Sequence, residues 1–245
     1  MPTVTAIIIT KNEASKIEAC LKSLDWVNEI IVLDSGSNDN TVEICQKFTP
    51  YVHQTDWPGF GPQKNRALAL ATSDWILSID ADEFISKNLR NEILETVKIK
   101  EFNAYKIPRL SSYCGKFLKH GGWWPDYVTR LIKKGGGEFT NDLIHERIIS
   151  HGITGTLKNH IIHYRSDKLE DTLDRMNKYS TIWANENKEK KKSNIGIAIF
   201  HSMWTFIRIY FIRMGFLDGR EGFLMAVSNS IGSFYKYVKI IYQTK

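Results

Sequence analysis

Three acidic residues, Asp80, Asp82 and Glu83, follow directly after a short apolar run at residues 75–79. The run predicts a buried strand of a parallel sheet, and ligands of open α/β sheets bind just beyond the carboxyl ends of such strands. Because Asp80 and Asp82 lie two positions apart, their carboxylates can face one point. Such a pair suits Mg²⁺ or Mn²⁺, whose remaining ligands are phosphates and water. The alternative is that the acids cap a helix expected at residues 88–98.

Polar residues also follow two other expected strands. The first strand runs into Thr10, Asn12 and Glu13, and the second ends at Asp34. Since parallel strands of an α/β sheet end at the same edge, we expect these side chains to lie near the acids described above. A carboxylate such as Asp34 can accept a hydrogen bond from a nucleotide base. The alternative for Asp34 is an ordinary strand-to-helix turn.

Two basic residues, Lys64 and Arg66, lie on a helix expected at residues 63–71. Their charges could offset those of a diphosphate, or they could lie on a solvated helix face. The sequence contains no G-x-G-x-x-G, G-x-x-x-x-G-K-[ST] or G-x-S-x-G motif. The commonest dinucleotide, P-loop and hydrolase signatures are therefore absent.

Strands and helices alternate through the first 80 residues in the order of a doubly wound sheet. Apolar and β-branched runs predict strands at residues 4–10, 29–33, 51–54 and 75–79. Apolar residues at helical spacing predict helices at residues 14–24, 41–48 and 63–71.

The composition is that of a folded chain with an anionic partner. The chain has 245 residues, of which 42% are hydrophobic, enough for one domain with an extension. The net charge of +6 indicates a nucleotide, nucleic acid or anionic membrane face, but the scattered basic residues argue against nucleic acid. Three cysteines favour a reduced cytosolic chain. Residues 1–5 lack the features of a signal peptide, so we expect none.

Four ordered blocks resemble family 2 glycosyltransferases of the GT-A fold. They are Thr10-Lys-Asn-Glu13, Val32-Leu-Asp-Ser-Gly-Ser-Asn-Asp-Asn-Thr41, Gly61-Pro-Gln-Lys-Asn-Arg-Ala67 and Asp80-Ala-Asp-Glu83. Downstream blocks are similar to the bacterial subgroup that includes β-1,4-glucosyltransferases of lipopolysaccharide core assembly. They are Gly121-Gly-Trp-Trp-Pro-Asp-Tyr127 with Arg130-Leu131, Ile144-His-Glu146, His163-Tyr164 and Gly215-Phe-Leu-Asp-Gly-Arg-Glu-Gly-Phe223. The resemblance covers nearly the whole chain and implies a Rossmann-like α/β domain with a mostly parallel sheet.

The resemblance also implies roles for single residues. Those implied in nucleotide-sugar binding are Thr10, Asn12, Glu13, Asp34, Lys64, Asp80 and Ala81. The first three would line the base and ribose pocket, Asp34 would contact the base, and Lys64 would lie near the diphosphate. Asp82 would bind a divalent cation directly, Asp80 would face the ribose or this cation, and His163 would be a third ligand. A lone histidine is also often structural.

Such enzymes invert the anomeric centre, and a carboxylate deprotonates the acceptor hydroxyl while it attacks C1 of the sugar. Many relatives have a Glu-Asp pair well after D-x-D, where this chain has a His-Glu pair ending at Glu146. Glu146 is therefore the expected base, with Asp126 and Asp142 as alternatives. Otherwise, Glu146 would form a surface ion pair with Arg130 or Arg147.

The character of the sequence changes near residue 165, so we expect a catalytic domain at residues 1–165 and a helical extension at 166–245. A polar helix is expected at residues 168–191, and amphipathic helices rich in aromatics at 195–214 and 223–242. Their uninterrupted apolar runs are shorter than the roughly 20 residues of a spanning helix. They favour a hairpin in a membrane interface, and the alternative is a helical pair packed on the core or in a dimer interface.

Two tryptophans, Trp123 and Trp124, lie in a loop with glycine and proline neighbours. Aromatic rings stack well on sugar faces, so this pair could contact an acceptor. The alternative is that the two rings fill the core.

The sequence thus predicts a metal-dependent, inverting glycosyltransferase that moves a hexose, glucose from a UDP-sugar, to a lipopolysaccharide-core or other glycolipid acceptor. We expect it in the cytoplasm, peripheral on the inner face of the cytoplasmic membrane. Two alternatives stay open. A sugar nucleotidyltransferase should have a Gly-rich basic loop after the first strand, which this chain lacks. A non-catalytic receiver-like module would leave the second half of the chain without a purpose.

Overall fold

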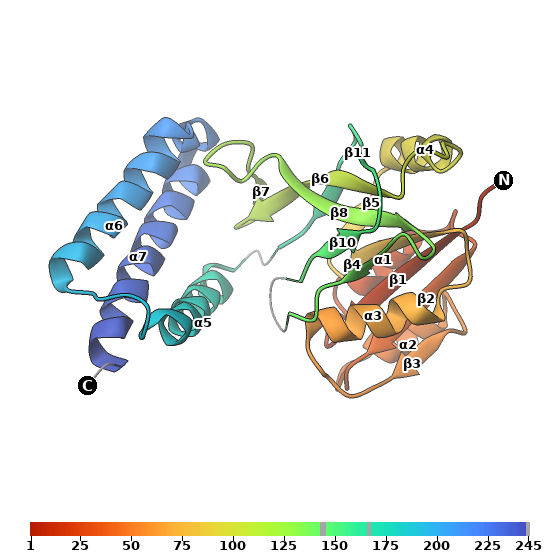
Figure 1. The fold of residues 1–245 in the computed structure, drawn as a ribbon, viewed down its shortest axis with the longest axis horizontal. Helices are drawn as coiled ribbons and strands as arrows, with labels where there is room; N and C mark the ends of the chain where they lie inside the picture. The colour runs from red at the N-terminus through yellow and green to blue at the C-terminus, as the bar shows by residue number, and fades with distance from the viewer. Residues whose placement is uncertain (143–145, 166–167, 244–245) are drawn as a thin grey trace. The chain divides into compact units, whose positions relative to one another are not determined.

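The computed structural model describes residues 1–142, 146–165 and 168–243. The chain forms two compact units (Figure 1). Unit 1 contains residues 1–109 and 127–163, and unit 2 contains residues 110–126 and those from 164 onward. The expected boundary near residue 165 thus lies close to one passage between the units. The sequence analysis assigned residues 110–126 to the catalytic domain, whereas in the structure they belong to unit 2.

The main sheet has the strand order β3-β2-β1-β4-β8-β6-β12-β5. Its members are β1 Val4–Thr10, β2 Glu29–Asp34, β3 Val52–Gln54, β4 Trp75–Asp80, β5 Glu83–Ile85, β6 Ala104–Tyr113, β8 Asp126–Lys133 and β12 Ile161–His163. The first four strands in this order are parallel, while β8 is antiparallel to β4 and β12 is antiparallel to β5. The short strands β7 Lys116–Phe117 and β11 Thr154–Thr156 also belong to this sheet, where each pairs with β6, and β9 Gly137–Phe139 and β10 Ile148–Ser150 form a separate two-stranded sheet.

Four helices accompany the sheet of unit 1: α1 Ile17–Lys22, α2 Thr41–Gln46, α3 Phe60–Leu70 and α4 Lys87–Thr96. The first two are shorter than expected. In α1, the Ser23 hydroxyl donates to the Cys20 carbonyl oxygen at 2.7 Å and closes the last turn. The hydroxyl of Ser86 caps α4 by accepting from the backbone N–H of Leu89. The alternative that the acids after β4 cap this helix is therefore wrong.

Strand β1 is central because every one of its residues is buried. Its side chains alternate between two hydrophobic clusters, as the pleat requires. Ala6 and Ile8 pack in the cluster that includes Leu21 of α1. Ile7 packs in the other cluster, with Ala67 of α3. The β-branched run thus specifies a strand covered on both faces.

The strand order reverses between β1 and β4, and this reversal positions the site. From β1 the chain proceeds outward to β2 and β3, and it then returns to β4 on the other side of β1. Thr10 pairs in register with Asp34 of β2, and Ile9 with Asp80 of β4. The polar ends of three strands therefore lie side by side, as predicted, at a reversal of strand order, which is where open α/β sheets bind ligands.

Unit 2 contains α5 Leu169–Asn187, α6 Ile195–Ile207 and α7 Gly219–Gln243, with a π-helical turn η1 Arg208–Ile212 and a 3₁₀ turn η2 Gly215–Asp218. Helices α6 and α7 form an antiparallel hairpin (Figure 1). The Ser202 hydroxyl donates to the Ser230 carbonyl oxygen at 3.0 Å. The His201 ring stacks on Tyr237, with centroids 4.1 Å apart. Small polar and aromatic pairs thus fix the register of the hairpin.

Asp218 explains why residues 110–126 belong to unit 2. Its buried carboxylate accepts from the backbone N–H groups of Lys119 and His120, and from the His120 ring at 3.0 Å. In the same unit, Tyr113 packs in one cluster with Met225 of α7. The hairpin is therefore packed on a segment that the sequence analysis placed in the catalytic domain.

The same hairpin carries many exposed apolar side chains. Phe200, Trp204 and Phe211 are 66%, 48% and 56% exposed. Residues Ile195–Ile212 form one helical stretch with a mean hydropathy of 1.5, long and apolar enough by length and composition to cross a membrane. Polar residues interrupt this stretch, so its uninterrupted apolar runs are short, as expected from the sequence.

Candidate active site

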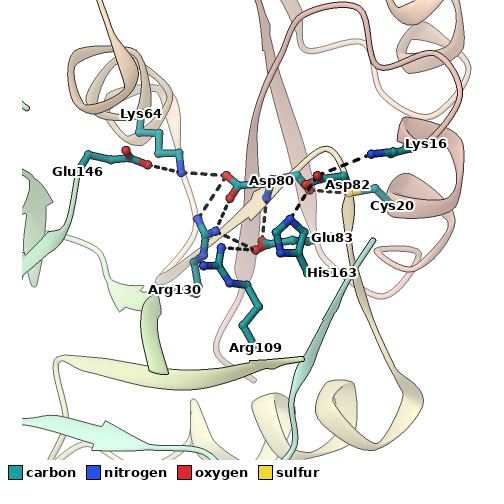
Figure 2. Close-up of polar contacts among 10 residues, drawn as sticks. All are labelled: Lys16, Cys20, Lys64, Asp80, Asp82, Glu83, Arg109, Arg130, Glu146 and His163. Carbon is teal, nitrogen blue, oxygen red and sulfur yellow. Dashed lines mark hydrogen bonds and ion pairs between the residues drawn. The ribbon is translucent and has the colours of Figure 1, made fainter. Parts of the chain in front are cut away.

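Asp80 ends β4 and is held by cations on two sides (Figure 2). It accepts from the Lys64 ammonium at 2.8 Å, and both of its oxygens are bound by the Arg130 guanidinium. Burial alone would raise the pKa of Asp80, but the charges of Arg130 and Lys64 lower it well below its ordinary value. Asp80 is therefore ionised, and its charge is already compensated by the protein.

Glu83 is fully buried beside Asp80. It accepts from Arg130 at 2.9 Å and from Arg109 at 3.2 Å, and its other oxygen accepts from the backbone N–H of Asp80 at 3.0 Å. The charges of Asp80 and Glu83 outweigh the effect of burial and raise the pKa of Arg130. Buried charges require such pairing, because an isolated one would be strongly destabilising.

Lys64 joins Asp80 to Glu146. Its side chain is 4% exposed, and its ammonium lies 2.7 Å from a Glu146 carboxylate oxygen and 2.8 Å from Asp80. The ammonium thus lies between two carboxylates, and its expected position near a diphosphate stays a prediction. Glu146 pairs with this buried lysine rather than with Arg130 or Arg147 on the surface.

We call these six side chains the central charge network: Lys64, Asp80, Glu83, Arg109, Arg130 and Glu146. Their charges balance at three positive and three negative (Figure 2).

The segment before Glu146 is tied to α3 by the side chain of Asn65. The Asn65 side chain donates to the Phe139 carbonyl oxygen and accepts from its N–H, both at 2.8 Å. The next residue, Thr140, exchanges hydrogen bonds with Arg147, the neighbour of Glu146. A Cβ on Gly61 would lie 1.9 Å from the Thr140 carbonyl oxygen, so this close approach requires glycine. The same helix therefore supplies Lys64 and positions the strand that leads to its partner.

Replacing Arg130 by methionine should lower the free energy of unfolding by about 3–5 kcal/mol, because it leaves buried carboxylates without their cation. Chemical denaturation measures this loss. Arg66→Met is the matched control: Arg66 pairs with Asp56, whose side chain is 76% exposed, and such a pair contributes about 1 kcal/mol or less. Equal losses in the two variants would contradict the structural importance of the central charge network.

Asp82 forms a second polar point beside this network. One of its carboxylate oxygens lies 3.2 Å from Nε2 of His163 and 3.9 Å from the Lys16 ammonium. His163 is buried in β12 and pairs in register with Glu83 of β5. Burial and the charge of Asp82 raise the pKa of Glu13. The sequence-predicted residues Asp82, His163 and Glu13 are therefore brought together.

The donor types at Asp82 fit a divalent cation bound jointly with a ligand. Asp82 offers carboxylate oxygens and His163 an imidazole nitrogen, while both oxygens of Asp80 are engaged by Arg130 and Lys64. Within residues 1–142, 146–165 and 168–243, no three His, Cys, Asp or Glu side chains form a metal-binding group. Two protein ligands completed by phosphate oxygens and water suit Mg²⁺ or Mn²⁺. The arrangement thus favours Asp82 over Asp80 as the ligand.

The loops after β1 and β2 are tied together by their polar residues. Asn12 has a positive φ of 56°, donates its N–H to the Ser37 hydroxyl, and accepts from the Asn38 N–H, both at 2.8 Å. Asp34 is fully buried, and its carboxylate accepts from the backbone N–H of Ser37 at 2.9 Å. This bond forms the strand-to-helix turn that was the alternative to a contact between Asp34 and a base. The buried Thr10 hydroxyl has no partner among the described residues. This edge is therefore preformed.

The remaining predicted residues lie elsewhere or only flank the network. Ala81 is buried between the two aspartates. Asp126 begins β8 and falls in unit 2, and its expected role as an alternative base stays a prediction. Asp142 is exposed. Arg66 pairs with Asp56 on the surface, as the alternative of a solvated helix face proposed.

The sequence analysis gave no role at this edge to Arg130, Arg109 or Lys16. One signal was available for Arg130. It lies in the strand Asp126–Lys133 directly before the buried pair Leu131 and Ile132, and a charge at such a position needs a buried partner. No local pattern identifies that partner, because Asp80 is 50 residues away.

Comparison with known proteins agrees with this geometry. The model of glycosyl transferase family 2 matches residues 5–211. An uncharacterized glycosyltransferase of Rickettsia bellii (strain RML369-C) is 31% identical, over 97% of this chain and 85% of its own. The lipopolysaccharide core biosynthesis glycosyltransferase LpsC of Rhizobium meliloti (strain 1021) is 29% identical, over 96% of this chain and 91% of its own.

Solved structures agree on the fold. The crystal structure of S. aureus TarS 1-349 in complex with UDP-GlcNAc matches with a TM-score of 0.51 and 16% sequence identity, over 95% of this chain and 81% of its own. With the strand ends converging at the reversal between β1 and β4, and with the family model spanning most of the sequence, the chain belongs to glycosyl transferase family 2 and is a glycosyltransferase of the GT-A fold.

Proposed function

We propose that this glycosyltransferase moves a hexose, glucose from a UDP-sugar, to a hydroxyl of a lipopolysaccharide-core or related glycolipid acceptor, with inversion at the anomeric carbon. Membership of the family supports a nucleotide-sugar donor. TarS, which shares the fold, was crystallised with UDP-GlcNAc. The name of LpsC supports the acceptor class. The nucleotidyltransferase and receiver-like alternatives are set aside, because the family model spans residues 5–211.

The observation that carries this proposal is the link between the strand-end acids and Glu146. Lys64 contacts both Asp80 and Glu146 within 2.8 Å, so a donor-side carboxylate and a candidate base are fixed to one buried cation. An inverting transfer needs both functions in one place, since the acceptor must attack C1 from the face opposite the leaving diphosphate. The strand-end loops with Asn12 and Glu13 would hold the base and ribose.

In the proposed reaction, Glu146 accepts the proton of the acceptor hydroxyl as the new bond to C1 forms and the bond from C1 to the diphosphate oxygen breaks. Glu146 is held by Lys64 in a half-buried position, so its carboxylate meets the hydroxyl without a large rearrangement. Asp34 would accept from the base, and Thr10 would contact the nucleoside through its unpartnered hydroxyl. Asp80, already bound by two cations, would position the ribose.

A divalent cation fits at Asp82 and His163, as described above. When bound there, it would supply charge that stabilises the leaving diphosphate. Lys16, whose ammonium lies 3.9 Å from Asp82, adds a positive charge at the same point. Glu13 and Asp82 lie close enough for their charges to interact, and a cation would relieve that repulsion.

The proposed function is tested by a donor screen on the full chain. UDP-glucose, UDP-galactose, UDP-GlcNAc and GDP-mannose are compared by calorimetry and by hydrolysis with Mg²⁺ or Mn²⁺. We expect UDP-glucose to bind most tightly and to be hydrolysed slowly without an acceptor. Transfer to purified lipopolysaccharide core should give a product whose NMR spectrum shows the inverted anomeric configuration. A preference for GDP-mannose would overturn the donor assignment, and retention of configuration would overturn the mechanism.

We further propose that the protein is cytoplasmic and lies peripherally on the inner face of the cytoplasmic membrane through the hairpin of α6 and α7. Its exposed aromatic side chains, Phe200, Trp204 and Phe211, suit the interface between headgroups and acyl chains. A cluster of lysines at residues 188–192 suits anionic lipid. A glycolipid acceptor would be reached from that surface.

The double variant Phe200→Ser with Trp204→Ser should bind anionic vesicles at least about tenfold more weakly than the unchanged chain, because burial of each side chain contributes about 1.5–3 kcal/mol. Co-sedimentation with phosphatidylglycerol-containing vesicles measures this. Salt should weaken binding without abolishing it, since the apolar part is unscreened. Ile99→Ser is the control, because Ile99 is an exposed apolar residue of unit 1. Vesicle binding that is unchanged in the double variant would contradict the interfacial hairpin.

A further inference from the structure

Unit 2 contains a cavity of about 380 Å³ that the proposed reaction does not use. Helices α5, α6 and α7 and the end of β6 line it. Its volume lies in the range of about 300–1,000 Å³ that is usual for small-molecule sites. The residues that line it are mostly hydroxyl-bearing, aromatic and basic: Ser112, Tyr113, Trp123, Arg165, Thr172, Arg175, Met176, Tyr179, Ser180, Thr205, Ser228, Asn229, Gly232, Ser233 and Lys236.

The charges of the cavity are all of one sign. Arg165, Arg175 and Lys236 line it, and none of the described residues that line it is an aspartate or glutamate. Burial lowers the pKa of Lys236, and its ammonium lies 5.6 Å from the centre of the Trp183 ring. An anionic ligand would offset the desolvation of Lys236 and would also meet Arg175.

One residue that lines the cavity has a hydroxyl without a hydrogen-bond partner among the described residues. Ser112 as a whole is 1% exposed, and its hydroxyl makes no such bond. The adjacent Tyr113 hydroxyl, by contrast, lies 3.0 Å from the hydroxyl of Ser228. Buried hydroxyls without partners are costly, so a ligand with hydroxyl groups would satisfy Ser112.

Aromatic rings complete the lining. The indole N–H of Trp123 donates to the Ser111 carbonyl oxygen at 3.0 Å and fixes the ring. The Arg165 guanidinium lies 5.3 Å from the centre of the same ring. The guanidinium lies over one face of the ring, so the apolar face of a sugar would stack on the opposite face. This geometry extends the expectation that Trp123 contacts an acceptor.

The walls of the cavity are braced in advance. Lys239 of α7 donates to the hydroxyls of Ser180 and Thr181 on α5, at 2.8 and 2.7 Å. Its ammonium also binds Asn177. Because α5 and α7 are fixed to each other by these bonds, the cavity exists without its ligand, and less ordering is needed on binding.

We propose that this cavity binds a sugar bearing a phosphate or carboxylate group, and that this sugar is part of the acceptor. The second clause rests on the proposed function, because only a glycosyltransferase needs a saccharide acceptor. Hydroxyl groups of the sugar would pair with the serines, its apolar face would lie on Trp123, and its anionic group would meet Arg175 and Lys236.

The ligand class is tested by calorimetry on the full chain with four probes: glucose 6-phosphate, glucuronate, glucose and inorganic phosphate. We expect one of the two anionic sugars to bind at least about tenfold more tightly than glucose or phosphate, because charge-assisted and sugar contacts then act together. Whichever of them binds identifies the anionic group. Equal binding of glucose would overturn the anionic requirement, equal binding of phosphate would overturn the sugar requirement, and no binding would overturn the proposal.

The location is tested with charge-removing variants. Arg175→Gln and Lys236→Gln should each weaken binding of the anionic sugar at least about tenfold. Lys178→Gln is the matched control, since it removes one charge from the exposed surface of the same helix, outside the cavity. Thermal unfolding of each variant verifies that the chain still folds. Displacement of the anionic sugar by UDP would overturn the location of the site. Equal affinity of all three variants for this sugar would also overturn it.

Failure of this inference is distinguishable from failure of the proposed function. Donor hydrolysis that persists in a chain that binds no anionic sugar would overturn the cavity proposal alone. Binding of an anionic sugar without any donor hydrolysis would overturn the proposed function, together with the assignment of that sugar to an acceptor.

Discussion

Asp82→Asn should lower sugar transfer by about 10²–10³-fold while the chain keeps its fold. The substitution preserves the shape of the side chain but removes the charge that would hold a divalent cation beside the leaving diphosphate, and the loss of one such electrostatic contribution has about this effect. The structure supports Asp82 for this role because its carboxylate faces His163 at 3.2 Å, whereas Asp80 is compensated by Arg130 and Lys64.

Three measurements test this result. Steady-state transfer with UDP-glucose gives the change in rate, calorimetric titration of Mn²⁺ gives the change in metal affinity, and thermal unfolding verifies the fold. Asp74→Asn is the control, since this exposed acid binds Thr3 before β4 and should leave transfer unchanged. Full activity of Asp82→Asn, or of the unchanged enzyme in excess chelator, would contradict the metal site.

Glu146→Gln should lower transfer by about 10²–10⁴-fold, the usual contribution of a positioned general base. Glutamine can still accept a hydrogen bond from Lys64 but cannot take up the proton of the acceptor hydroxyl. Binding of UDP-glucose should change little, because the residues proposed for the nucleotide lie in the loops after β1 and β2. The separation of unchanged donor affinity from lost transfer identifies the base.

Two other acids serve as controls for the base. If Glu146 is the base, Asp126→Asn and Asp142→Asn should each retain transfer. A bell-shaped or sigmoidal pH profile of kcat/KM that loses its acidic limb in Glu146→Gln would support the assignment. If Asp126→Asn removes transfer and Glu146→Gln does not, the base is Asp126.

Local sequence patterns predicted the parallel half of the sheet well. The run of β-branched and apolar residues gave β1 its observed bounds, Val4–Thr10, because a strand buried on both faces leaves a continuous signal. Helix ends were less predictable, since apolar spacing specifies which face is buried but not where the last hydrogen bond forms. For this reason α1 and α2 end before residues 24 and 48, the expected limits.

Contacts between distant residues account for what the sequence could not predict. Arg130 pairs with Asp80 across 50 positions, and Asp218 binds His120 across 98. Neither pairing has a periodic or motif signature. The predicted polar residues at the strand ends do lie close together, because the parallel strand order alone brings Thr10, Asp34 and Asp80 side by side.

The balance of the central charge network has a consequence during turnover. At rest, three cations and three carboxylates cancel. In the proposed reaction, Glu146 becomes neutral when it takes up the acceptor proton, so the network acquires one unit of positive charge. At that moment the departing nucleoside diphosphate gains negative charge. Transfer of the acceptor proton to Glu146 would therefore give the network a positive charge that attracts the leaving diphosphate. Activation of the nucleophile and stabilisation of the leaving group would then be coupled through this charge.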